Sequence, residues 1–90
     1  MDYTTVKLLF FTADWCENCK PAKNGIGKLA KRFPGLVVEE VDVAAKPLVA
    51  GSCHVEGLPT VIVTRGCVEV ERFTGSGCLN KVTKCLVGMV

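Results

Sequence analysis

The sequence predicts an α/β domain in which a four-stranded mixed β-sheet is flanked by three helices, in the order β-α-β-α-β-β-α. Three observations carry this prediction. An apolar run opens the chain, and a segment with helical periodicity follows it. Further apolar strands then alternate with connecting segments. A short turn joins the last two strands, so we expect them to be antiparallel, whereas strands joined through a helix are expected to be parallel.

The first strand is expected over residues 4–12, because their nearly continuous β-branched, aromatic and aliphatic character is typical of a strand buried on both faces. A turn over residues 13–16 leads into a helix that extends to about Phe33, where a Pro-Gly dipeptide ends it. Gly25 and Gly27 weaken this helix by about 1 kcal/mol each relative to alanine. Its apolar positions recur with a 3.6-residue period on one face: Ala22, Ile26, Leu29, Ala30 and Phe33.

The second strand is expected over residues 36–42, followed by a connecting segment that holds a short helix around residues 48–51. The third strand is expected over residues 60–64. After a tight turn, residues 68–73 alternate apolar and charged side chains, as in a half-exposed strand. A Gly-Ser-Gly break follows, in which Ser76 is the expected cap of the last helix. That helix carries apolar residues on one face: Leu79, Val82, Leu86 and Met89.

Composition and charge narrow the class of protein. The chain suits one domain, expected over residues 1–90, and 49% hydrophobic against 22% charged residues excludes a disordered chain. The net charge of +2 comes from interspersed side chains without an aromatic-rich basic stripe, which argues against nucleic-acid binding. No apolar segment suits a membrane span or a secretory signal, so we expect a cytoplasmic protein without a membrane partner. We also expect a monomer. In a reducing compartment, six cysteines indicate catalytic, metal-binding or core residues rather than a disulfide framework.

The motif Cys16-Glu17-Asn18-Cys19 lies where the first strand ends and the first helix begins. Two cysteines three residues apart in a first helical turn can bring their sulfur atoms within bonding distance. Unpaired backbone N–H groups and the positive end of the helix dipole stabilise a thiolate, which is the nucleophile in disulfide exchange. The motif therefore predicts redox chemistry in which Cys16 attacks a disulfide and Cys19 then releases the bound product.

Four segments of the chain are informative: Ala-Asp-Trp-Cys-x-x-Cys-Lys at 13–20, Glu-Val-Asp-Val at 40–43, Val-Glu-Gly-Leu-Pro-Thr at 55–60 and Phe-Thr-Gly at 73–75. Together these segments resemble the thioredoxin family. The resemblance covers nearly the whole chain from Lys7 onward and implies the thioredoxin fold. It includes no counterpart of the N-terminal strand and helix of full-length thioredoxins, so the chain is closer in size to glutaredoxins. By this resemblance Cys16 is the attacking cysteine and Cys19 the resolving cysteine.

The resemblance also implies substrate-binding residues around the motif. Trp15 corresponds to the tryptophan that offers an apolar surface beside the site. Pro59 corresponds to a cis-proline that faces the cysteines, which would leave the backbone of Leu58 available to pair with a substrate peptide. Gly75 corresponds to a glycine that lets the substrate backbone come close.

The implied function is a thiol–disulfide oxidoreductase that reduces protein disulfides and is recharged by a thioredoxin reductase. It would need no cofactor beyond the redox-active Cys16–Cys19 disulfide. Two alternatives remain open: a glutaredoxin-like enzyme reduced by glutathione, which the sequence Gly57-Leu58-Pro59 disfavours, and an interaction module that uses the fold as a platform. Cys53-His54 could supply only half of a zinc site and no second Cys-x-x-Cys exists, so no metal is expected.

Three departures from the family pattern bear on this chemistry. A Glu-Asn pair separates the cysteines where thioredoxins have Gly-Pro, and its carboxylate opposes a thiolate on Cys16, against the helix dipole. Phe10 stands where the family has a buried aspartate, so no carboxylate is expected there to take the proton of Cys19. Pro21 suits only the first turn of a helix, which places the helix start near residues 16–18.

The other cysteines and the single histidine carry weaker signals. Cys78 and Cys85 follow the apolar stripe of the last helix, so we expect core residues that are too far apart for a mutual disulfide. Cys67 is expected at an exposed hairpin, and His54 on a surface loop. For Cys53 the alternative of a regulatory or dimer-forming thiol remains open.

Overall fold

The fold is a single mixed sheet with helices on both faces, in a computed structural model that describes residues 5–66, 68–75 and 77–89. The strands lie in the order β2-β1-β3-β4. β1 is parallel to β2 and antiparallel to β3, and β3 is antiparallel to β4. The expected fold class and element order are therefore confirmed. The elements are β1 (Val6–Thr12), α1 (Cys19–Arg32), β2 (Val37–Asp42), α2 (Pro47–Ser52), β3 (Thr60–Arg65), β4 (Val68–Thr74) and α3 (Cys78–Met89).

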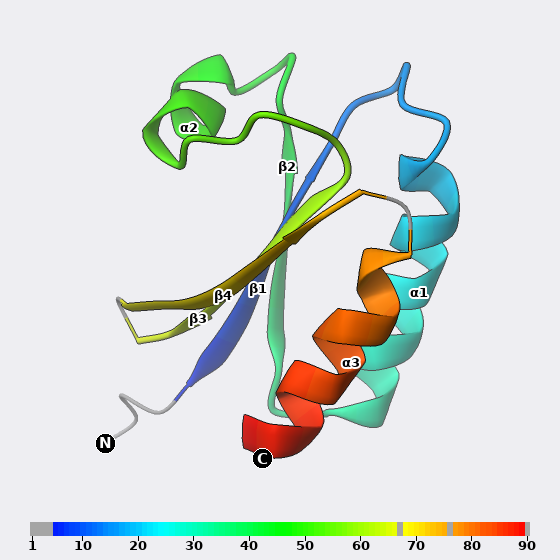
Figure 1. The fold of residues 1–90 in the computed structure, drawn as a ribbon, viewed down its shortest axis with the longest axis vertical. Helices are drawn as coiled ribbons and strands as arrows, with labels where there is room; N and C mark the ends of the chain where they lie inside the picture. The colour runs from blue at the N-terminus through cyan, green and yellow to red at the C-terminus, as the bar shows by residue number, and fades with distance from the viewer. Residues whose placement is uncertain (1–4, 67, 76, 90) are drawn as a thin grey trace.

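Two apolar clusters hold the helices to the sheet. On one face, α1 and α3 lie side by side across the strands, and α2 lies on the other face (Figure 1). Alternate residues of β1 supply both clusters, because successive side chains of a strand point to opposite faces. Leu8 and Phe10 pack in the cluster of α1 and α3, whereas Phe11 packs with Val41 and Ile62 in the cluster beside α2. This arrangement explains the continuous apolar character of the first strand.

The first helix begins slightly later than the sequence suggested. α1 starts at Cys19 with Asn18 as its N-cap, and a tight turn precedes it, in which the Cys19 N–H donates to the Cys16 carbonyl over 3.3 Å. Pro21 therefore lies in the first turn, where helix N–H groups have no partner in any case. At the other end, Phe33 is the C-cap, and its N–H donates to the carbonyl of Leu29. The helix therefore ends near Phe33, as expected.

A glycine allows α1 and α3 to pack closely. A Cβ atom on Gly25 would lie 3.0 Å from Cγ of Leu79, whereas one on Gly27 would meet nothing within 4 Å. Val82 and Leu86 of α3 are buried, and Leu79 is half-buried against the same cluster. The apolar stripe expected for the last helix therefore faces the sheet and α1.

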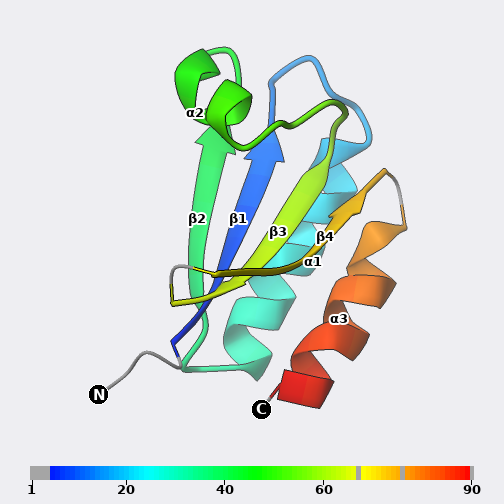
Figure 2. The ribbon, with the colours of Figure 1, turned by 60° about the vertical axis from the view of Figure 1, so that its left-hand side comes forward.

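The edge strand β4 is more exposed than its alternating pattern suggested. Val68 and Val70 are both exposed. α2 lies toward the β2 edge of the sheet, at the opposite side from β4 (Figure 2), so one face of β4 remains uncovered. A register shift between Val63 and Thr64 further interrupts the pairing of β3 with β4. Val68 and Val70 are therefore exposed because the short helix α2 does not extend over β4. The local sequence pattern of β4 does not show how far α2 extends.

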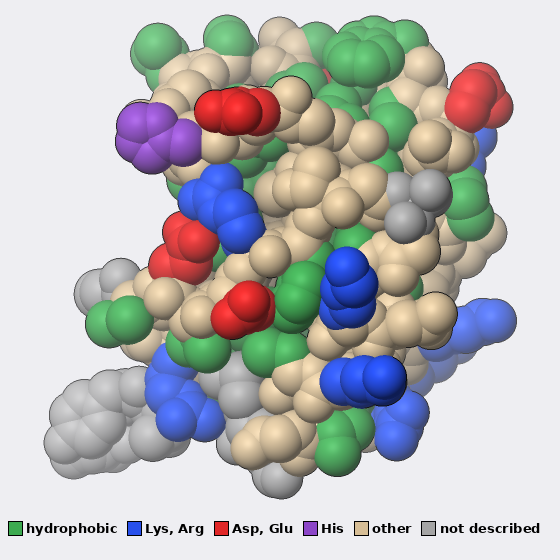
Figure 3. Space-filling model, viewed as in Figure 1, with side chains coloured by type: hydrophobic (Ala, Val, Ile, Leu, Met, Phe, Trp, Pro, Cys, Tyr) green, Lys and Arg blue, Asp and Glu red, His purple; other side chains and the backbone are tan. Residues whose placement is uncertain are grey.

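Some expectations fall outside the described residues. They concern the start of the first strand at residue 4, the hairpin position of Cys67, the cap at Ser76 and the side chain of Met89. In the described ranges, no helix has the length and apolar character needed to cross a membrane. Acidic and basic side chains are interspersed on the face shown in Figure 3.

Candidate functional site

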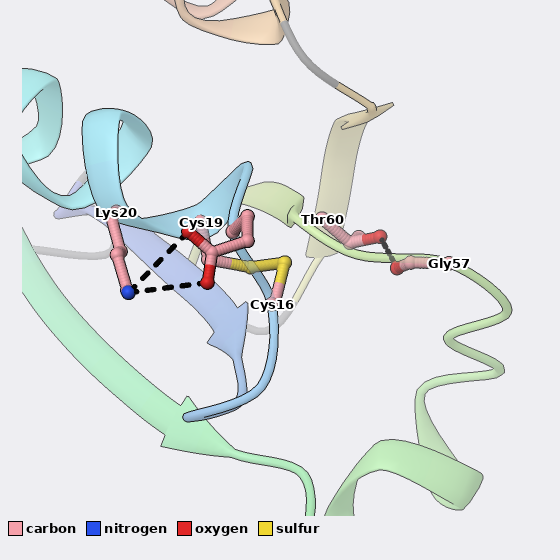
Figure 4. The surroundings of a disulfide bond; sticks show 6 residues. Cys16, Cys19, Lys20, Gly57 and Thr60 are labelled. Atoms are coloured by element: carbon pink, nitrogen blue, oxygen red, sulfur yellow. Dashed lines mark hydrogen bonds and ion pairs between the residues drawn. A yellow bond between two sulfur atoms is a disulfide. The ribbon is translucent and has the colours of Figure 1, made fainter.

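The two motif cysteines form a disulfide where the chain enters α1 (Figure 4). Their Cα atoms are 5.3 Å apart. Cys16 lies in the turn before the helix, and its N–H donates to the carbonyl of Ala13 over 3.1 Å. Cys19 is the first helical residue. Cys16 is 8% exposed and Cys19 is 2% exposed, so an incoming molecule reaches Cys16 more readily.

The charges around Cys16 partly offset one another. Glu17 follows Cys16 in the chain, and the ammonium of Lys20 lies 3.3 Å from the Glu17 carboxylate. Both side chains are exposed, so this ion pair contributes little to stability. The first turn of α1 contains no acidic residue, and Asn18 makes no side-chain capping bond. The N-terminal dipole of the helix is therefore not neutralised by a capping side chain.

The Leu58–Pro59 peptide bond is cis, as the sequence resemblance implied. Figure 4 shows the Gly57–Thr60 segment beside the disulfide, and Leu58 packs against the cluster that contains both cysteines. The hydroxyl of Thr60 donates to the Gly57 carbonyl over 2.6 Å and fixes the loop. Within the described ranges, the backbone of Leu58 takes part in no hydrogen bond.

The other two residues expected around the motif are Gly75 and Trp15. Gly75 has φ +99°, and its N–H donates to the Pro59 carbonyl over 2.9 Å. Trp15 immediately precedes Cys16 and is 70% exposed. The fold thus gathers the loop, the glycine and the cysteines, and leaves the indole at the surface.

A hollow of about 150 Å³ opens beside the disulfide at the ends of β1 and β2. Glu40 and Lys23 meet across it, with 3.5 Å between carboxylate and ammonium. Its charged and sulfur-bearing lining consists of Cys16, Cys19, Asp14, Glu40, Asp42, Lys20 and Lys23. Sequence reasoning alone assigns no role to Glu40. What marks Glu40 is its pairing with Phe10 in the sheet. That pairing depends on how β1 and β2 align, which the local sequence does not show.

Cys53 and His54 lie in the loop after α2 and do not line this hollow. Arg72 of β4 donates to the carbonyl of Cys53 over 2.8 Å and to that of His54 over 3.2 Å. Arg72 also binds Glu69, whose carboxyl pKa is lowered by that hydrogen bond. In the part of the chain that the structure describes, no three His, Cys, Asp or Glu side chains are grouped to hold a metal ion.

The two cysteines of α3 lie apart from the motif. Cys78 is buried, as expected of a core residue, and Cys85 is half-buried. Burial raises the pKa of both thiols above the ordinary cysteine value. Neither side chain lines the hollow beside the disulfide.

Comparisons with known proteins agree on one family. The family model described as Thioredoxin matches residues 2–87. A thioredoxin H-type from Fagopyrum esculentum is 36% identical over 66 residues, which cover 73% of this chain and 57% of that protein. Solved thioredoxins of Trypanosoma brucei brucei and Fasciola hepatica each superpose with a TM-score of 0.90, at 26% and 25% identity. They cover 99% and 97% of this chain, and this chain covers 78% and 83% of theirs. The chain spans little more than half the length of the plant relatives it matches.

Proposed function

The chain belongs to the thioredoxin family, and on that premise we propose that it is a thiol–disulfide oxidoreductase that reduces protein disulfides. The observation that carries the proposal is the disulfide between Cys16 and Cys19 at the start of α1. A cysteine pair held at bonding distance at a helix start can be opened and closed in turnover.

Cys16 is the nucleophile of the proposed reaction. It is the more exposed cysteine, and it precedes a helix whose first turn carries no acidic side chain. Backbone N–H groups at that helix end stabilise a thiolate. The thiolate attacks a substrate disulfide, so that Cys16 becomes bonded to one substrate sulfur and the other sulfur leaves. Cys19 then attacks Cys16, which restores the intramolecular disulfide and releases the reduced substrate.

The substrate is proposed to bind over Trp15 and along the cis-proline loop. The exposed indole offers an apolar surface next to Cys16. The backbone of Leu58 has no hydrogen-bond partner within the described ranges, so its N–H and C=O groups suit pairing with an extended peptide. Pro59 fixes this segment, and Gly75 adds no side chain beside it. This arrangement supports a protein or peptide disulfide as the substrate.

Mixed-disulfide trapping tests the assignment of the two cysteines. The Cys19→Ser variant, reduced and mixed with a cystine-linked peptide, is expected to accumulate a covalent adduct on Cys16. The Cys16→Ser variant is expected to form none at that site, and Cys53→Ser serves as the matched control that behaves as wild type. Peptide mapping by mass spectrometry locates the adduct. An adduct that survives Cys16→Ser at an undiminished rate would refute the assignment.

The proposed electron donor is a thioredoxin reductase, with no cofactor in this chain beyond the cysteine pair. Wild-type protein and a disulfide substrate are incubated with NADPH and either a thioredoxin reductase or glutathione together with glutathione reductase. The proposal predicts faster NADPH consumption with the first pair. Faster consumption with glutathione would favour the glutaredoxin-like alternative. Partner binding that persists in the Cys16→Ser/Cys19→Ser double variant, without any turnover by wild type, would favour an interaction module.

A further inference from the structure

The resolving cysteine must lose a proton from an enclosed position. Cys19 is 2% exposed, and only its thiolate can attack the bond between Cys16 and a substrate. The strand β1 carries no carboxylate that could accept this proton, and Phe10, which faces this side of the sheet, is buried in the core. The hollow of about 150 Å³ beside Cys19 is therefore the route by which its proton can leave.

Glu40 reaches this hollow from the neighbouring strand. It pairs with Phe10 in the parallel ladder of β1 and β2, and paired residues share a face of the sheet. Phe10 packs in the cluster of α1, so Glu40 also lies on the α1 face. Its carboxylate is 3.5 Å from the ammonium of Lys23, which lies one helical turn after Cys19. The side chain of Glu40 remains 43% exposed, so water reaches it.

The other charged groups of the hollow are less suited to accept this proton. Asp42 uses Oδ1 to accept the N–H groups of Ala44 and Ala45, at 2.9 and 3.3 Å. Lys20 and Lys23 are cations, and Lys20 is paired with Glu17, which does not line the hollow. Asp14 lies in the exposed turn before Cys16 and, within the described ranges, forms no ion pair with α1. Of the three carboxylates that line the hollow, Glu40 is the one that forms an ion pair with α1 within the described residues.

We propose that Glu40, positioned by Lys23, accepts the proton of Cys19 during resolution of the mixed disulfide. This inference rests on the proposed function. The S–H bond of Cys19 breaks, and its proton passes to the Glu40 carboxylate, directly or through one water. The electron pair left on Cys19 forms the bond to the sulfur of Cys16. The bond from Cys16 to the substrate breaks, and its electron pair leaves on the substrate sulfur, which takes up a proton. The two cysteines are thereby oxidised and the substrate disulfide is reduced.

A single-turnover experiment separates attack from resolution. Reduced protein in excess is mixed with a symmetrical cystine-linked peptide, quenched with acid and analysed by mass spectrometry, which counts the adduct on Cys16. In Glu40→Gln the adduct is expected to form at the wild-type rate. It is expected to decay about ten- to a hundredfold more slowly at pH 7, because a positioned general base contributes at least this much. The decay rate of the variant should rise about tenfold per pH unit, since hydroxide must take the proton, whereas the wild type rises less steeply.

Glu39→Gln is the matched control. Glu39 precedes Glu40 on β2, points to the opposite face and pairs with Lys7 at 2.8 Å, so its loss removes the same charge away from the hollow. It is expected to leave both rates unchanged. Lys23→Gln is expected to slow only the decay, and by less than Glu40→Gln. Thermal unfolding of each variant verifies that the fold is retained.

The outcomes distinguish a failure of this inference from a failure of the proposed function on which it rests. If wild type forms no adduct on Cys16, the proposed function fails and the inference fails with it. If the adduct forms and Glu40→Gln resolves it at the wild-type rate and pH dependence, only the inference is overturned. It is likewise overturned if Asp42→Asn or Asp14→Asn slows resolution while Glu40→Gln does not.

Discussion

The backbone N–H of Gly75 donates a hydrogen bond to the carbonyl of Pro59, with 2.9 Å between nitrogen and oxygen. This bond ties the end of β4 to the loop that precedes β3. One residue away, the hydroxyls of Thr60 and Thr74 lie 3.1 Å apart and reinforce the connection. The two segments proposed to receive a substrate are therefore held to each other beside the disulfide, which favours a preorganised binding surface.

The conformation of Gly75 gives a prediction for stability. Its φ is +99°, and a Cβ atom there would meet nothing within 4 Å, so only the backbone conformation resists a side chain. Gly75→Ala is expected to lower the free energy of unfolding by about 1–2 kcal/mol. Urea denaturation measures this change. An alanine variant as stable as wild type would show that the Gly75 backbone is not constrained in solution.

The two glycines of α1 are expected to behave differently on substitution. Gly27→Ala should raise the free energy of unfolding by about 0.5–1 kcal/mol, because alanine favours the helix and the site is open. Gly25→Ala gains the same helix propensity, but its Cβ would lie 3.0 Å from Leu79 and must displace it. We expect its stability to fall below that of Gly27→Ala by about 1–3 kcal/mol. Equal stabilisation of both variants would contradict the close packing of α1 on α3.

The buried thiol of Cys78 makes stability depend on pH at the alkaline end. Burial raises its pKa in the folded state above the ordinary cysteine value of 9.0, so the folded chain retains a proton that the unfolded chain has lost. The protonated Cys78 thiol therefore contributes its full share to the free energy of unfolding below about pH 9. This contribution declines as the pH rises through the folded-state pKa of Cys78. Between pH 8 and 10, Cys78→Ala is therefore expected to lose less stability than wild type. Urea denaturation of both proteins across this pH range measures the difference. Equal losses of stability in wild type and Cys78→Ala would contradict a contribution from this thiol.

Much of the fold follows from local sequence pattern. The continuous apolar first strand and the 3.6-residue period of the first helix each describe an element whose burial is set by its own residues. The exposure of Val68 and Val70 could not be predicted in this way. It depends on how far α2 extends over the sheet, which is a property of the assembled fold.

In the candidate site, too, some residues could be predicted from the sequence and one could not. Cys16 and Cys19 follow from their spacing at a helix start, and the cis bond at Pro59 follows from the family resemblance. Glu40 has no local signal, because its place beside Cys19 depends on the register between two parallel strands. A carboxylate on a neighbouring strand becomes visible only when that register is known.

The most direct test of the proposed dithiol mechanism is the rate of insulin disulfide reduction by dithiothreitol. The rate is measured without protein, with wild type and with Cys16→Ser, at equal concentrations. We predict that wild type accelerates the reduction and that Cys16→Ser adds nothing to the rate with dithiothreitol alone. Equal acceleration by both proteins, or none by wild type, would contradict the claim that Cys16 and Cys19 reduce protein disulfides.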